Sequence, residues 1–281
     1  MITLRDHGGT IDDFVPVSGQ WALVMEYKQL GMSSSAQFWY LRAVNLGTRQ
    51  VISLAQATGP PATTELPFYT ISGNRIVWDQ VTAAGVKVLD MYDLGTRRSS
   101  TVPLPLGVYP VRPILVGDQL VFLDNSTDPH RAREEFDTGG GQLMRYDLST
   151  GQLIRLDSTN DARNPSANDS LIAWSDETAG GNNSIKITPI AGHGIKPLAP
   201  LAIQAFLSDS YAAWYDYNAR QLFAYSFAEH RTVQLTVAGE PDLRAQYALC
   251  GATFYYALPP DVDGDRSVIR SLDLSQAFAA H

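Results

Sequence analysis

The chain repeats one short pattern six times, in which a tight turn leads into an apolar strand. The residue five positions after the middle of the turn is aromatic in five of the six repeats. The turns are Ser18–Gln20, Ser72–Asn74, Val116–Asp118, Asn168–Ser170, Ser208–Ser210 and Cys250–Ala252. Their middle residues are 54, 44, 52, 40 and 42 positions apart, and the residues that follow are Val24, Trp78, Phe122, Trp174, Trp214 and Tyr256. Such a period is typical of proteins in which each repeat forms one supersecondary unit. The sequence therefore predicts a repeat architecture.

The third repeat shows the content of one unit most clearly. It contains four short apolar segments, Val111–Val116, Gln119–Leu123, Gln142–Tyr146 and Gln152–Leu156. Short alternating segments separated by Gly, Asp, Asn and Ser predict β-strands, because these residues favour tight turns. A four-stranded sheet that is apolar on both faces packs between two similar sheets. We therefore expect Trp78, Trp174 and Trp214 to fill the space between sheets.

These features predict an all-β fold, a six-bladed β-propeller of four-stranded antiparallel blades that forms one domain over residues 1–281. The expected blades are approximately 15–60, 67–106, 111–158, 165–200, 204–238 and 244–274 plus 1–5. The last blade has only three strand candidates, whereas Ile2–Leu4 precedes the first blade. We expect Ile2–Leu4 to pair as the outer strand of the last blade and to close the ring, because closure removes exposed sheet edges.

Several repeats also share a longer pattern: an aromatic residue and an aspartate after the second strand, then a Tyr-Asp-Leu turn. It occurs in Ile76–Asp79 with Tyr92–Leu94, Leu120–Asp124 with Tyr146–Gly151, Ile172–Asp176, and Trp214–Asn218 with Leu235–Thr236. This pattern resembles the repeats of TolB-type (WD40-like) β-propellers. Such propellers serve as periplasmic scaffolds, lectin-like modules, regulatory domains of peptidases and, in a few cases, lyases. The resemblance implies a periplasmic or extracellular binding protein, although one fold hosts many functions.

Charge and composition exclude some partners. The net charge of −8 argues against a nucleic-acid or anionic-membrane surface, and no basic run is longer than Arg97–Arg98. No run of 18 apolar residues predicts insertion into a membrane. Met1–Thr10 lacks the apolar segment of a signal peptide, so a cytoplasmic location stays open. We expect a monomer whose single cysteine, Cys250, is a small buried residue.

Long connections suggest where a partner binds. The connections between second and third strands vary most, namely Tyr27–Ala36, Asn125–Gly141, Glu177–Asn183 and Leu258–Arg266. Insertions gather where a scaffold tolerates them and where binding sites are often placed. The longest, Asn125–Gly141, contains the candidate binding residues His130, Arg131 and Arg133, and it is either a lid over the central funnel or a solvated insertion.

Two further sets of residues are candidate sites. Arg112, Arg163 and Arg244 lie in connections between blades, and their guanidinium groups suit an anion-binding rim, unless they form salt bridges between blades. Asp261, Asp263 and Asp265 have the carboxylate spacing of calcium-binding loops, although a plain acidic hairpin fits the same residues. No other cofactor is expected.

Catalytic motifs are absent from the sequence. It contains no Gly-x-Ser-x-Gly, no His-Glu-x-x-His and no phosphate-binding glycine loop. The favoured interpretation is a non-catalytic binding or scaffold module that presents its loops to a protein, peptide or glycan. The alternatives are an enzyme on acidic polysaccharide, lyase-like, that uses the arginine rim and a metal, and a sensor or regulatory domain of a larger protein.

Overall fold

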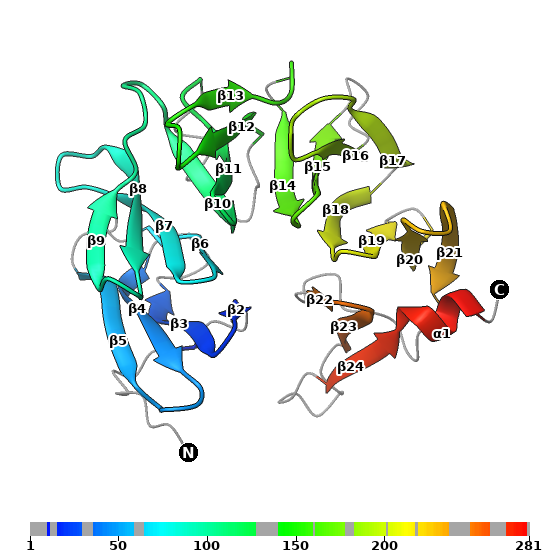
Figure 1. Cartoon of the computed structure of the whole chain (residues 1–281), viewed down its shortest axis with the longest axis horizontal. Helices are drawn as coiled ribbons and strands as arrows, with labels where there is room; N and C mark the ends of the chain where they lie inside the picture. Colours follow the sequence, from blue (N-terminus) through cyan, green and yellow to red (C-terminus); the bar gives the residue numbers. More distant parts are fainter. Residues whose placement is uncertain are drawn as a thin grey trace. The chain divides into compact units, whose positions relative to one another are not determined.

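A computed structural model describes residues 10–11, 16–29, 36–58, 65–127, 140–159, 161–177, 183–200, 202–216, 219–235, 248–258 and 268–279. The chain divides into two compact units, Met1–Asp161 and Ala162–His281, and each is described by itself (Figure 1). The boundary falls between the third and fourth predicted repeats. The expectation of one domain over residues 1–281 stays a prediction.

The first unit contains three antiparallel sheets, which follow one another along the chain. The first sheet consists of β1 (Thr10–Ile11), β2 (Val17–Ser18), β3 (Trp21–Gln29), β4 (Ala36–Asn45) and β5 (Val51–Thr58). The second consists of β6 (Tyr69–Ser72), β7 (Arg75–Val81), β8 (Lys87–Asp93) and β9 (Arg98–Thr101). The third consists of β10 (Pro110–Val116), β11 (Gln119–Asp124), β12 (Gln142–Asp147) and β13 (Leu153–Arg155).

The second unit contains the remaining sheets that the structure describes. The fourth sheet consists of β14 (Ala162–Ala167), β15 (Leu171–Glu177), β16 (Asn183–Pro189) and β17 (Lys196–Pro200), and the fifth of β18 (Ala202–Leu207), β19 (Tyr211–Asp216), β20 (Gln221–Ser226) and β21 (Arg231–Leu235). The sixth consists of β22 (Ala248–Cys250), β23 (Thr253–Leu258) and β24 (Val268–Asp273), and α1 (Leu274–Ala279) follows it.

The all-β prediction is confirmed, and so are the four strands of the third repeat to within two residues. In the second to sixth sheets the strands pair in chain order, and in the first sheet β1 and β2 both pair with β3. The inner strands of successive sheets lie beside one another: β2, β6 and β10 in the first unit, and β14, β18 and β22 in the second. The predicted closing strand, Ile2–Leu4, lies outside the described residues. No helix among the described residues has the length and apolar character needed to cross a bilayer.

The large residues that follow the repeated turns form the core between sheets. Trp78 of the second sheet packs in one cluster with Trp39 of the first, and Phe122 of the third sheet packs with Leu89 of the second. Trp214 of the fifth sheet likewise shares a cluster with residues of the fourth. The prediction is confirmed for Trp78 and Trp214; Trp174 is fully buried, and its place between sheets stays a prediction. The prediction for Cys250 is wrong, because this residue at the end of β22 is exposed.

The repeated turns also connect one sheet to the next. The backbone N–H of Gly73 donates to Ser18 Oγ at 2.9 Å, and that of Gly117 donates to Ser72 Oγ at 3.2 Å. Both glycines have a φ near +57°, which a two-residue hairpin turn requires and which glycine adopts without strain. Each serine therefore satisfies a donor of the following repeat. In the second unit, the Asn168 side chain donates to Ser208 O at 2.6 Å across the same kind of boundary.

The hairpin between the third and fourth strands is held by an aspartate. Asp147 Oδ1 accepts hydrogen bonds from the backbone N–H groups of Ser149 and Thr150, both at 2.9 Å, and Gln119 donates to Oδ2 at 2.8 Å. Hydrogen bonds from Ser149 and Gln119 stabilise the carboxylate and hold the pKa of Asp147 well below its ordinary value of 3.8. Asp93 accepts an equivalent bond from Thr96 in its own hairpin, so the predicted turn chemistry is confirmed there, whereas Asp273 accepts the N–H of Ser275 at the start of α1.

We expect Asp147→Ala to lower the melting temperature at neutral pH. Because the pKa is lower in the folded state, the carboxylate contributes stability above pH 3.8, and this contribution disappears as the pH falls through the folded-state pKa. The difference in melting temperature between variant and wild type should therefore shrink in strong acid. Asp169→Ala is the matched control, since this exposed turn aspartate accepts no side-chain hydrogen bond among the described residues. Equal effects of the two substitutions would contradict the assignment.

Candidate functional site

The longest connections between strands leave one end of the sheets. Because the strands are antiparallel and pair in chain order, the connection from the second to the third strand leaves the same end as the connection to the next sheet. We call this the loop end and the opposite end the turn end. At the turn end the connections from first to second strands are residues 19–20, 73–74, 117–118, 168–170, 208–210 and 251–252. Those from third to fourth strands, at the same end, are residues 46–50, 94–97, 148–152, 190–195 and 227–230. At the loop end they reach 125–141 between strands and 236–247 between sheets. The predicted concentration of long connections at one end is thus a property of the observed topology.

Most of the residues predicted to bind a ligand lie outside the described residues. These are His130, Arg131, Arg133 and Arg244, and the candidate calcium ligands Asp261, Asp263 and Asp265. Their roles stay predictions. Within the described ranges, no three side chains of His, Cys, Asp or Glu are grouped closely enough to hold a metal ion.

Arg112 is described, and it lies at the loop end of the third sheet. It occupies a bulge in β10, where the register with β11 shifts, and its φ of 54° is rare for a residue with a side chain. Its backbone N–H donates to Asp79 Oδ2 of the second sheet at 3.1 Å. Its guanidinium lies over the ring of Phe68 at 4.3 Å from the centroid, and Phe68 is 43% exposed. An arginine and an aromatic ring are thus stacked at the surface on a fixed backbone.

A buried charge cluster lies beneath this stack. Lys87 Nζ is 3.1 Å from Asp79 Oδ1 and 2.8 Å from Glu65 Oε1. The side chains of Lys87 and Asp79 are at most 1% exposed, and that of Glu65 is 12% exposed. Asp79 Oδ1 also accepts the N–H of Phe68 at 3.2 Å. Asp79 therefore connects Lys87 to the backbone of both members of the stack.

Burial governs the charges in this cluster. Desolvation raises the pKa of Asp79, Lys87 opposes that effect, and the neighbouring Glu65 adds to it. Burial alone would lower the pKa of Lys87, but the attraction of the two carboxylates outweighs burial and raises it. The cluster thus holds one ammonium between two carboxylates. Sequence analysis did not find it, because Glu65 lies in a connection without periodicity.

Arg163 is described in the second unit and is not the equivalent of Arg112. Pro110 pairs with Asp124 in the third sheet, and Ala162 pairs with Asp176 in the fourth. Counting from these pairs, the position of Arg112 corresponds to Asn164, whose φ of 44° is also positive. Arg163 is one residue earlier, and its carbonyl accepts the Ser175 hydroxyl at 3.1 Å. The three-arginine rim remains a prediction.

Acidic residues near the ends of the second strands pair within their own sheets. Arg42 donates two hydrogen bonds of 3.0 Å to Glu26 Oε2, and Lys186 forms an ion pair with Asp176. The two pairs occupy equivalent diagonal positions, because Arg42 lies opposite Val24 and Lys186 opposite Trp174. These carboxylates are therefore part of the repeat structure.

Structural comparison identifies the architecture. The β-propeller domain of the Trilobed protease from Pyrococcus furiosus aligns with 94% of this chain and 81% of its own, at 10% sequence identity and a TM-score of 0.65. This chain has a β-propeller fold. TolB from Acinetobacter baumannii aligns with 79% of the propeller described here at 15% identity and a TM-score of 0.53, and the acylaminoacyl peptidase from Pyrococcus horikoshii aligns with 94% at 11% identity and a TM-score of 0.66. The expected similarity to TolB-type propellers is confirmed at the level of the fold.

The propeller spans only part of two of these proteins, 53% of the TolB chain and 45% of the peptidase chain. At identities of 10–15% the similarities establish the fold alone. No protein-family model matches the sequence, and no curated protein matches it.

Proposed function

We propose that this propeller is a non-catalytic binding or scaffold module whose loop end holds a protein, peptide or glycan partner. The observation that carries the proposal is the difference between the two ends of the sheets, with short turns at one end and the long connections at the other. Loops that vary in length on a rigid scaffold are common binding elements. The similar structures support this role, since two are a propeller domain of a protease and TolB.

The surface at the loop end of the second sheet supports the same proposal. Phe68 is 43% exposed and Val86 is 54% exposed, and the Arg112 guanidinium lies over the Phe68 ring. Aromatic residues and arginine are enriched among the residues that dominate binding energy at interfaces. The buried cluster around Lys87 fixes the backbone beneath them, which reduces the entropy lost on binding. The enzyme on acidic polysaccharide and the sensor domain of a larger protein stay alternatives that no specific observation favours.

The proposal includes the finer architecture and its setting. Six blades would correspond to the six sheets, and Ile2–Leu4 would supply an outer strand to the sixth sheet, for which the structure describes three strands. We place the protein in the periplasm or outside the cell, as a monomer, with calcium at Asp261, Asp263 and Asp265 as its one proposed cofactor.

Deletion of residues 1–6 tests the closing strand. We expect the melting temperature to fall sharply, because the deletion removes backbone pairing and exposes a sheet edge. Substitution of the same residues with a glycine-serine segment of equal length is the control for chain length and should cause a similar fall. A melting curve that coincides with that of the wild type would exclude closure by this segment.

Photo-crosslinking in the producing cells tests the binding role. A photoreactive amino acid is introduced at the exposed loop-end positions Ala84 and Thr127, and at the exposed turn-end positions Leu46 and Asp169 as matched controls. We expect the loop-end positions to give a defined adduct, identified by mass spectrometry, and the turn-end positions to give none. Binding of the labelled protein to a glycan array would detect a glycan partner that does not crosslink. Adducts of the same kind and yield from both ends would contradict a partner at the loop end.

A further inference from the structure

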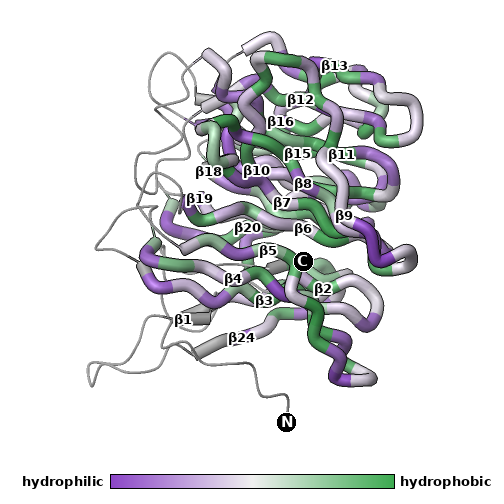
Figure 2. Tube along the Cα trace, turned by 90° about the vertical axis from the view of Figure 1, so that its left-hand side faces the viewer, coloured by the Kyte–Doolittle hydropathy of each residue, from purple (hydrophilic) through white to green (hydrophobic). Residues whose placement is uncertain are grey.

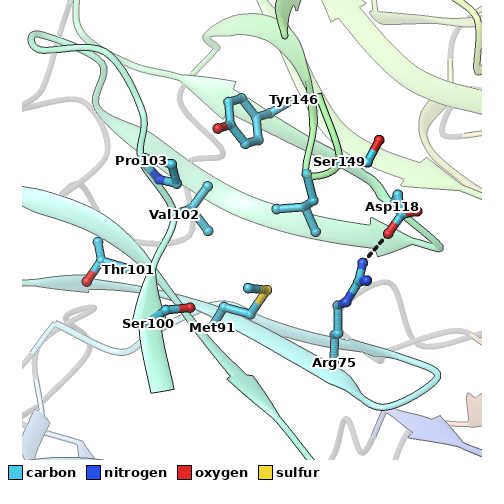
Figure 3. A pocket seen from close by; sticks show the side chains of 10 residues that line it. Arg75, Met91, Ser100, Thr101, Val102, Pro103, Asp118, Tyr146 and Ser149 are labelled. Atoms are coloured by element: carbon cyan, nitrogen blue, oxygen red, sulfur yellow. Dashed lines mark hydrogen bonds and ion pairs between the residues drawn. The ribbon is translucent and has the colours of Figure 1, made fainter. Parts of the chain in front are cut away.

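A pocket lies between the second and third sheets of the first unit, along the outer strand β9 (Figure 3). Its volume is about 420 Å³, which is within the range of ligand-binding pockets. Met91, Val102, Tyr146 and Leu148 supply its apolar surface. The ion pair of Arg75 with Asp118 lies at its turn end, as Figure 3 shows.

An open strand edge borders this pocket. β9 pairs with β8 on one side, all four of its residues are exposed, and Ser100 and Thr101 line the pocket. The N–H of Val102 donates to Leu89 O at 2.8 Å. Because hydrogen-bonded and non-hydrogen-bonded pairs alternate along an antiparallel ladder, the N–H and C=O groups of Ser99 and Thr101 point away from β8. The edge therefore offers backbone donors and acceptors to another strand.

The faces of β9 decide which side chains of an added strand reach the pocket. Thr101 Oγ1 donates to Asp90 at 2.7 Å on the face directed toward the first sheet, where Trp78 packs. Ser100 and Val102 lie on the other face, toward the third sheet, because side chains alternate along a strand. A residue paired opposite Ser100 projects on this second face. Its side chain would enter the pocket and contact Met91, Val102 and Tyr146.

Charge beside the strand indicates the character of the partner. Arg97 and Arg98 form the longest basic run of a chain with net charge −8, and both are exposed. Neither side chain forms an ion pair within the described part of the chain. The nearby carboxylates do have partners: Asp118 pairs with Arg75, and Asp93 accepts the N–H of Thr96 at 2.6 Å. Figure 2 colours the start of β9 as hydrophilic.

We propose that β9 and the adjacent pocket form a second binding surface, which takes an extended acidic peptide by strand addition. The peptide backbone pairs with Ser99 and Thr101, one large apolar side chain occupies the pocket, and flanking carboxylates contact Arg97 and Arg98. In peptide recognition of this type, backbone bonds give affinity and a side-chain pocket gives specificity. This surface is separate from the proposed partner site at the loop end.

Selection from a phage-displayed library of random dodecapeptides against the full chain tests the proposal. We expect the enriched peptides to contain one aromatic or large aliphatic residue flanked by Asp or Glu. Ser100→Trp should weaken binding of the enriched synthetic peptide at least about tenfold, because the indole fills the pocket from the exposed edge. Fluorescence polarisation measures the affinity, and circular dichroism verifies that each variant is folded.

Ser53→Trp is the matched control, since it places the same side chain at an exposed position of β5, the outer strand of the first sheet. It should leave the affinity within about threefold of the wild type, because it lies outside the proposed surface. Every second amide of the peptide should donate to β9. N-methylation of that set should abolish binding, and N-methylation of the other set should not. Reversal of charge in an Arg97→Glu/Arg98→Glu variant should lower the affinity for the peptide. The affinity of this variant should also depend less on salt concentration than that of the wild type.

Three results would overturn the proposal. The first is equal peptide affinity of the Ser100→Trp variant, the Ser53→Trp variant and the wild type. The second is failure of the library to yield any peptide that competes for this surface. The third is a signal on a glycan array that Ser100→Trp abolishes without any peptide binding, which would assign the pocket to a sugar. None of these results bears on the adducts expected from photo-crosslinking at the loop end, so the two proposals can fail independently.

Discussion

Lys87→Met is expected to lower the free energy of unfolding by about 3–5 kcal/mol, because it leaves two carboxylates buried without their cation. Lys87 contacts Asp79 and Glu65 at 3.1 and 2.8 Å, and its side chain is 1% exposed. Methionine keeps most of the side-chain volume, so the loss reports on charge. Urea denaturation followed by circular dichroism measures it.

The loss should depend on pH in a defined direction. Burial already raises the pKa of Asp79, and removal of Lys87 removes the largest effect that lowers it. At a pH above 3.8, the ordinary pKa of an aspartate, Asp79 in the folded variant then holds a proton that the unfolded chain releases. The stability of the variant therefore increases as the pH falls. The loss should be smaller at about pH 5 than at about pH 8.

Lys186→Met provides the matched control for Lys87→Met. It breaks the ion pair with Asp176, but the Lys186 side chain is 25% exposed, and we expect a loss of about 1 kcal/mol or less. Equal losses for the two variants, or a loss at Lys87 that grows in acid, would show that the cluster does not hold the charges assigned to it.

Phe122→Ala is expected to destabilise the protein by a comparable amount, about 3–5 kcal/mol, because it creates a cavity between two sheets. Phe122 is fully buried in a cluster with Val77 and Leu89 of the second sheet and Leu115 of its own. The substitution should therefore weaken the contact between sheets as well as the third sheet itself. Urea denaturation again gives the magnitude.

Tyr255→Ala controls for loss of an aromatic residue from a strand. Tyr255 is 40% exposed on β23, and its removal should change the free energy of unfolding by about 0.5 kcal/mol or less. Phe122→Leu should retain most of the stability, since it keeps a large apolar side chain. A Phe122→Ala variant as stable as Tyr255→Ala would contradict a core between sheets.

The fold was predictable because each local signal agreed with the repeat. The four strands of the third repeat, the turn held by Asp147 and the buried positions of Trp78 and Phe122 all follow from alternation and turn chemistry that recur in each unit. Cys250 was mispredicted because its apolar neighbours suggested burial, whereas it lies at the exposed end of β22.

The candidate site was less predictable, since its geometry depends on register and on connections. Arg112 directly precedes Pro113, whereas Arg163 is two residues before Pro165, and strand pairing confirms that they are not equivalent. The contact of Lys87 with Glu65 joins a strand to a connection without a repeated pattern. Strand pairing also gave the edge of β9 its meaning, because the sequence does not show which amides point outward.

The hydrogen bonds from the turn glycines to the serines of the preceding repeat bear on how a repeat protein grows by duplication of its units. Gly73 and Gly117 each donate to a hydroxyl that lies one repeat earlier, so the second repeat carries both an acceptor for its successor, Ser72, and a donor for its predecessor, Gly73. A duplicated unit would therefore bring a complete joint with it. Coupling of this kind is between nearest neighbours, which is the condition under which arrays grow by duplication and unfold as a series of linked steps.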